Sequence, residues 1–205
     1  MSSRRSETDA VSNGDSACSS WTKSPSSDSS SSPIDAFRVE HVRAARDGRL
    51  LLHGRALRKP LAISNYAVQA QLTGATRIAR GGTYDLWRPD GTPRFSVFAG
   101  GLYHDHWLAN SGHFLVYPDA TGRVRGTLRL VVSLPKGTEQ TILRFIGPGV
   151  HRKVAVNPLQ TRVLHFRVST RGPWKLNFKT PRPGYLRDSR PISVQAQMPS
   201  FKRNP

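Results

Sequence analysis

The stretch of residues 123–134 most constrains the fold, because apolar and polar side chains alternate along almost its whole length. Successive side chains of a β-strand point to opposite faces of a sheet, so this pattern predicts a strand with one buried face and one wet face. The residues of the apolar face are Val124, Gly126, Leu128, Leu130, Val132 and Leu134. A sheet that is wet on one side is typically antiparallel.

Shorter alternating segments recur after residue 76 at intervals of roughly ten residues, a spacing typical of β-sandwiches. Clear examples are residues 164–168, 174–178 and 192–198. Turn sequences separate such segments, and the strongest is RPDG at 88–91, where Pro presets φ and Gly accepts a positive φ. The sequence therefore predicts an all-β fold, an antiparallel, jelly-roll-like β-sandwich over residues 76–201.

Charge and composition divide the rest of the chain. The sequence holds 31 lysines and arginines against 13 aspartates and glutamates, a net charge of +18. Three of these cations and four of the anions fall in the serine-rich residues 1–33, so the remainder carries +19. A segment so poor in apolar side chains cannot bury enough surface to offset the entropy of ordering it. We predict a disordered tail at 1–33 and a partly ordered lead-in at 34–75, whose apolar runs suit short strands.

Several classes of protein are excluded by what the sequence lacks. It has no apolar run of roughly eighteen residues, so we expect no transmembrane segment. Arg4 and Arg5 precede no apolar stretch, so a signal peptide is not expected either. Cys18 is the single cysteine, too few for a disulfide framework or a cysteine-based zinc site. Motifs of serine hydrolases and phosphate loops are missing, so we predict a protein that is not an enzyme and has no cofactor.

The sequence GGLYHDHW at 100–107 is the first candidate site. Tyr103 and Trp107 offer rings that stack on sugars, and Asp105 offers a carboxylate that accepts hydroxyl hydrogen bonds. These three residues are the predicted ligand-binding site. The simpler alternative is that the two aromatic side chains belong to the core and that Asp105 fixes the loop.

The same loop suggests a weaker metal-binding hypothesis. His104 and His106 are two residues apart, which on a strand places both imidazoles on one face, and His113 could be a third ligand. Metal enzymes with a jelly-roll fold carry a glutamate shortly after such a pair, and here residues 109–111 are Ala, Asn and Ser. The set is incomplete, so we expect no metal site and keep a metal-dependent jelly-roll enzyme only as an alternative.

The second candidate site is a set of cations on the polar faces of two strands. Arg123, Arg125 and Arg129 share one face of one segment, and Lys175 and Lys179 share a face of another. Such a basic face predicts, as an alternative function, binding of an anionic polymer or a nucleic acid. Aromatic side chains for base stacking are not evident beside these cations, so a nucleic-acid partner is the less favoured one.

An ordered series of motifs carries a resemblance to a known domain. The motifs are RGGTYDLWR at 80–88, GLYHDHW at 101–107, GPWKL at 172–176 and RPISV at 190–194. Together they resemble the C-terminal β-sandwich domain that follows the membrane portion of cell-envelope proteins of high-GC bacteria, glycosyltransferase-like ones among them. The resemblance covers about residues 76–201.

The resemblance implies a non-enzymatic accessory module outside the cytoplasm, which binds envelope carbohydrate or docks on a membrane protein. Two departures stand out. His106 occupies a position where the usual motif has Gly, and a serine-rich head stands where membrane helices are expected. The second departure would fit a truncated gene or an incorrectly assigned start.

Overall fold

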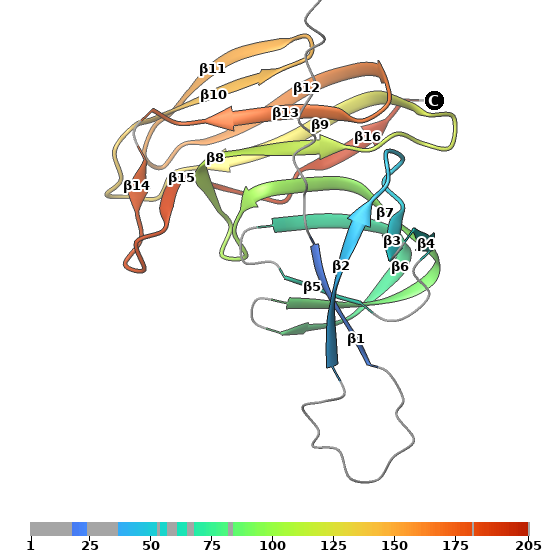
Figure 1. Cartoon of the computed structure of the whole chain (residues 1–205). Helices are drawn as coiled ribbons and strands as arrows, with labels where there is room; N and C mark the ends of the chain where they lie inside the picture. The colour runs from blue at the N-terminus through green and yellow to red at the C-terminus, as the bar shows by residue number, and fades with distance from the viewer. Residues whose placement is uncertain are drawn as a thin grey trace, which may run out of the picture.

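The chain is all-β. The computed structural model describes the backbone of residues 18–23, 37–52, 54–56, 61–64, 68–81, 84–181 and 183–204, and this part contains strands and turns but no helix. The strands pair antiparallel throughout, which confirms the predicted fold class (Figure 1). Of the predicted tail at 1–33, the structure describes only strand β1 (Cys18–Lys23).

Two groups of strands precede the sandwich. A small sheet has the order β1-β2-β3-β4, and its other members are β2 (Phe37–Ala44), β3 (Leu50–Leu52) and β4 (Arg55–Ala56). The second group consists of β5 (Leu61–Ser64), β6 (Val68–Gly81) and β7 (Tyr84–Leu102), and both β5 and β6 pair with β7. The predicted domain boundary at residue 76 thus falls inside β6.

The remaining strands form the sandwich, in a sheet path of order β11-β10-β13-β8-β15-β9-β12. Their bounds are β8 (Trp107–Val116), β9 (Arg123–Ser133), β10 (Thr141–Gly147), β11 (Val150–Val156), β12 (Thr161–Arg171), β13 (Trp174–Lys179), β14 (Gly184–Tyr185), β15 (Pro191–Ala196) and β16 (Ser200–Arg203). Strand β14 pairs with β15, β16 pairs with β9, and β7 adds to the sheet beside β8. In Figure 1 the β6–β7 hairpin curls below this sandwich.

The main core lies between the inner faces of the two layers, and the alternating residues supply it as predicted. Leu128 and Leu130 of β9 and Leu176 of β13 are fully buried. The rings of Phe145 (β10) and Phe166 (β12) meet across the layers with centroids 5.1 Å apart. Burying large aromatic rings of this kind supplies much of the apolar surface removed from water on folding.

A second core lies on the other side of β7 and β8. Leu50, Phe95, Phe98 and Tyr117 are buried there, with apolar side chains of β6 packed against them. This cluster attaches the lead-in strands to the sandwich. The lead-in therefore contributes ordered strands and a core of its own among the described residues.

The turn predicted at 88–91 is wrong, because these residues continue strand β7. Pro89 lies opposite Ala75 of β6, and Asp90 accepts a hydrogen bond from the Thr76 hydroxyl across the pair instead of bonding its own backbone. The register of β6 against β7 shifts near this point, between Thr73 and Ala75. Such irregularities tolerate a proline that cannot donate to the ladder. Pairing with a long neighbour therefore outweighs local turn chemistry here.

Gly112 gives a test of how closely the strands pack. A Cβ at Gly112 would collide with the Gly100 carbonyl oxygen and lie 2.5 Å from Cζ of Phe178, whose ring is buried. We expect Gly112→Ala to lower the free energy of unfolding by about 2–3 kcal/mol, because the core cannot shift to accept the methyl group. Urea unfolding measures this change. Gly91→Ala is the matched control, since a Cβ there meets nothing within 4 Å, and an equal loss in both variants would contradict the steric explanation.

Candidate anion-binding face

The loop between β7 and β8 is held by its own backbone. The amide of Tyr103 donates to the Trp107 carbonyl over 2.8 Å, and the amide of His106 donates to the Tyr103 carbonyl over 3.0 Å. His106 adopts φ 68°, a left-handed conformation that glycine reaches without steric cost. The loop thus keeps a backbone suited to glycine at the position where the sequence places His106.

The residues predicted to bind a ligand in this loop are engaged by Arg190, which precedes β15. Asp105 accepts from Nη2 of Arg190 over 2.6 Å, and Asp188 accepts from its Nε over 2.5 Å. The guanidinium carbon lies 4.7 Å from the centre of the Tyr103 ring, a cation–π arrangement. The third predicted residue, Trp107, is half-buried against the main core and beside Tyr103. The structure brings all three together, in a packed cluster.

Hydrogen bonding shifts the pKa values of Arg190 and Asp188 in that cluster. The hydrogen bond to Asp105 raises the pKa of Arg190 further above its usual range, with Asp188 adding to the effect. Desolvation acts to raise the pKa of Asp188, but hydrogen bonds from Arg190 outweigh it and leave that pKa below its usual range. Both carboxylates accept hydrogen bonds from Arg190, which ties the β7–β8 loop to the β14–β15 connection.

The three candidate histidines do not form a metal site. Among the described residues, no three His, Cys, Asp or Glu side chains gather closely enough to hold an ion. His106 is exposed in the loop, whereas His113 lies in β8 and stacks on Phe98 at 5.8 Å between ring centroids. Nε2 of His113 is buried and has no hydrogen-bond partner in the described part of the chain. Burial, with a smaller contribution from the charge of Lys175, lowers the pKa of His113 to about 4.

The predicted cations of β9 belong to a larger basic surface. Strand β12 lies beside β9 with Arg171 opposite Arg123 and Arg167 opposite Thr127, and β16 lies on the other side with Lys202 opposite Thr127. All of these cations are exposed. We call this surface the β9–β12–β16 face, and its cations are Arg123, Arg125, Arg129, Arg167, Arg171 and Lys202.

Among the described residues, no carboxylate pairs with the side chains of these cations. None of the strands β9, β12, β15 and β16 contains an Asp or Glu, and none of the six side chains forms an ion pair with a described residue. The carboxylate of Asp119, in the turn before β9, is taken up by Thr121 and by Arg203 at 3.6 Å. Like charges opposite each other in a sheet are destabilising, so this face retains unneutralised charge at some cost in stability.

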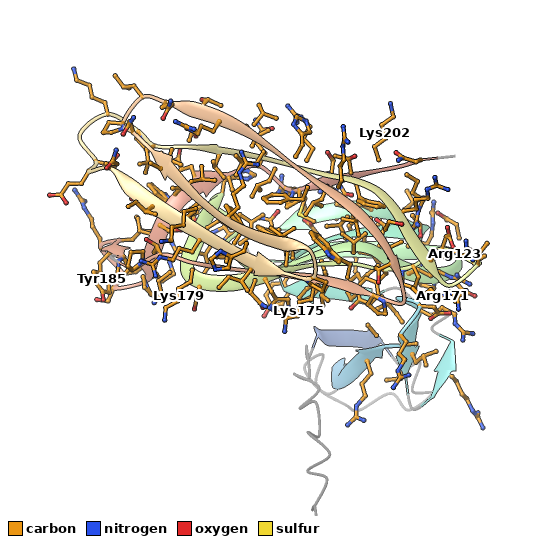
Figure 2. All side chains as sticks on the ribbon, turned by 90° about the horizontal axis from the view of Figure 1, so that it is seen from above. Arg123, Arg171, Lys175, Lys179, Tyr185 and Lys202 are labelled. Carbon is orange, nitrogen blue, oxygen red and sulfur yellow. The ribbon has the colours of Figure 1, made fainter. Side chains whose placement is uncertain are left out.

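Lys175 and Lys179 do not belong to this face. They lie on β13 in the other layer, where Lys179 is opposite Arg144 of β10. Figure 2 shows Lys202 on one side of the sandwich and Lys175 and Lys179 on the other. The five cations predicted as one anion-binding set are therefore split between β9 in one layer and β13 in the other.

Sequence reasoning missed Arg167, Arg171 and Lys202 as members of the site. The alternation of Arg167 with Phe166 and Val168 gives its wet orientation, but not which strand lies beside β12. That neighbour follows from the register of β12 against β9, which only the folded structure gives.

Comparison with models of known protein families, with curated proteins and with solved structures found no match. The resemblance to an envelope β-sandwich domain therefore stays a prediction. No helix that is long and apolar enough to cross a bilayer occurs among the described residues.

His106 tests the loop conformation. We expect His106→Gly to raise the free energy of unfolding by about 0.5–1 kcal/mol, because glycine adopts the left-handed backbone without strain. Thermal unfolding measures the gain. His106→Val, which carries a β-branched side chain, should instead be destabilising, and a loss of stability in the glycine variant would contradict the assigned strain.

His113 tests burial of a neutral imidazole. Its pKa is about 4 in the folded chain against 6.5 for the exposed group, so only the unfolded state binds the proton between these values. The free energy of unfolding should therefore fall as pH drops from 6.5 to 4, by about 2 kcal/mol from this ring after allowance for its partial exposure. Urea unfolding across this pH range, compared with His113→Leu, isolates the contribution. Identical pH profiles of the two proteins would refute it.

Proposed function

We propose that the protein is a non-enzymatic module that binds an acidic polysaccharide across the β9–β12–β16 face. The observation that carries the proposal is the group of six exposed cations on three neighbouring strands without an acid among them. Arg123 and Arg171 lie directly opposite each other, and the other cations lie on the same three strands, so their mutual repulsion has a cost that an anionic ligand offsets when it binds.

The spacing of the cations suits an extended polymer. Exposed side chains along a strand repeat every ~7 Å, and neighbouring strands lie ~4.8 Å apart. Five of the six cations are arginines, whose planar guanidinium groups bind carboxylate and sulfate groups through two parallel hydrogen bonds. A linear chain with an acidic group on successive sugars could therefore contact several arginines at once.

The choice of polysaccharide over nucleic acid rests on what the face lacks. The outward residues of β9, β12 and β16 include no Trp, Tyr or Phe, and the one ring among them is His165. Single-stranded nucleic acids bind on aromatic platforms, which this face does not offer. The face is also part of a regular sheet with no projecting helix or ribbon among its strands to enter the groove of a duplex.

The proposal is tested by removing charge from one face at a time. The variant Arg125→Gln/Arg129→Gln/Arg167→Gln should bind a fluorescein-labelled heparin oligosaccharide or polygalacturonate about 100-fold more weakly than the unmodified protein. The slope of log Kd against log salt should also fall by about 2–3. Fluorescence anisotropy between about 50 and 300 mM salt measures both quantities.

The matched control is Lys153→Gln/Lys175→Gln/Lys179→Gln, which removes the same charge from the opposite layer. This variant should lose no more than about threefold in affinity at one salt concentration. An equal loss of affinity in both variants would mean that binding depends only on the net charge of the protein, and this result would overturn the proposal. Tighter binding of a duplex DNA of similar charge than of either polysaccharide would overturn the choice of ligand.

A further inference from the structure

A cavity of about 570 Å³ lies outside the β9–β12–β16 face, where the β6–β7 hairpin curls toward the β7–β8 loop. Strands β6 and β7 supply most of its wall, and His106 and Met198 complete the lining. Gln69 ties β6 to the loop by donating from Nε2 to the Tyr103 carbonyl over 2.8 Å. A volume in this range is typical of sites for small organic molecules.

The charged groups of the cavity are two arginines and one carboxylate. Asp85 is nearly buried, with 10% of its side chain exposed, and lies 3.4 Å from Nη1 of Arg77 and 3.6 Å from Nε of Arg80. These distances are long for charge-assisted hydrogen bonds. The Arg77 guanidinium makes one hydrogen bond to the described residues and the Arg80 guanidinium makes none, although each has five N–H donors. The three groups sum to a net charge of +1, and the two arginine side chains, 48% and 55% exposed, keep donors that Asp85 does not occupy.

An apolar wall adjoins these donors. The Trp87 ring lies opposite Arg77 in the β6–β7 pair, with the guanidinium carbon of Arg77 5.9 Å from the ring centre. Leu72 and Met198 also line the cavity. A ligand that fits would carry one negative charge toward the arginines and a flat, apolar body toward Trp87.

We infer that this cavity binds a small aromatic carboxylate, held by Arg77 and Arg80 and packed against Trp87. The Asp85 carboxylate lies within ion-pair distance of both guanidinium groups and competes with the ligand for them, but it leaves most of their donors unoccupied. The site is independent of polysaccharide binding, since it shares no residue with the β9–β12–β16 face.

The binding test uses 2-naphthoate and its neutral analogue 2-naphthamide. The chain has four tryptophans, so the protein should give up to four indole N–H signals in a ¹H–¹⁵N spectrum, and Trp87→Phe identifies the signal of Trp87. We expect 2-naphthoate to shift that signal and to bind at least about tenfold more tightly than 2-naphthamide. No shift at millimolar 2-naphthoate, or equal binding of the two compounds, would overturn the inference.

Two substitutions should change the affinity in opposite directions. Arg80→Gln removes a donor and a charge and should weaken 2-naphthoate binding about tenfold, whereas Asp85→Asn raises the cavity charge to +2 and should tighten it about threefold. Arg88→Gln is the matched control, because Arg88 pairs with Asp90 and does not line the cavity.

Unchanged affinity in Arg80→Gln, or weaker binding by a folded Asp85→Asn protein, would refute the assignment. The Asp85→Asn measurement keeps the test decisive if loss of Arg80 leaves the Asp85 carboxylate unpaired and the chain unstable. If 2-naphthoate does not bind as expected, the polysaccharide titrations are unaffected, because the substitutions used there lie on other strands.

Discussion

Strand β8 pairs with strands of both layers, and the rest of the sandwich depends on this double pairing. Near its beginning, Trp107 and Ala109 lie opposite residues of β15, whereas residues 111–116 lie opposite β13. Buried backbone groups must find hydrogen-bond partners, so the layers cannot part along this edge without losing them. Strand β15 in turn pairs with β9, and β9 positions β12 and β16. The basic face therefore depends on a strand that contributes no cation to it.

Local sequence pattern predicted the parts of this fold that depend on one strand at a time. Period-two alternation gave the strands at 123–134, 164–168 and 174–178 and assigned their inner faces to the core, because burial acts on each side chain separately. Alternation could not predict which strands pair or in what register, because pairing depends on strands that are distant in the chain. The turn expected at 88–91 failed for the same reason, since pairing with β6 is a long-range interaction.

The candidate site shows the same limit. The wet orientation of Arg123, Arg125 and Arg129 followed from sequence, but their separation from Lys175 and Lys179 did not, because alternation does not say to which layer a strand belongs. In the loop at 101–107, the polar and aromatic residues were correctly selected as unusual. Their engagement by Arg190 depends on a residue more than eighty positions away.

Two cores support these surfaces, and their positions separate the surfaces from each other. The main core lies under the β9–β12–β16 face, and its apolar burial offsets the repulsion among the arginines above it. The second core lies between β7–β8 and the lead-in strands and supports the hairpin that borders the cavity. A substitution on the β9–β12–β16 face therefore affects packing in the main core, whereas a substitution at the cavity affects packing in the second core.

The absence of acids from the β9–β12–β16 face also governs how copies of this protein meet in solution. Two such faces repel each other, so the free protein resists stacking through this surface. A polyanion lying between two copies would cancel that repulsion, and a sufficiently long one would gather many copies along its length. The charge that keeps individual molecules apart would thereby make their assembly depend on the length of the polymer.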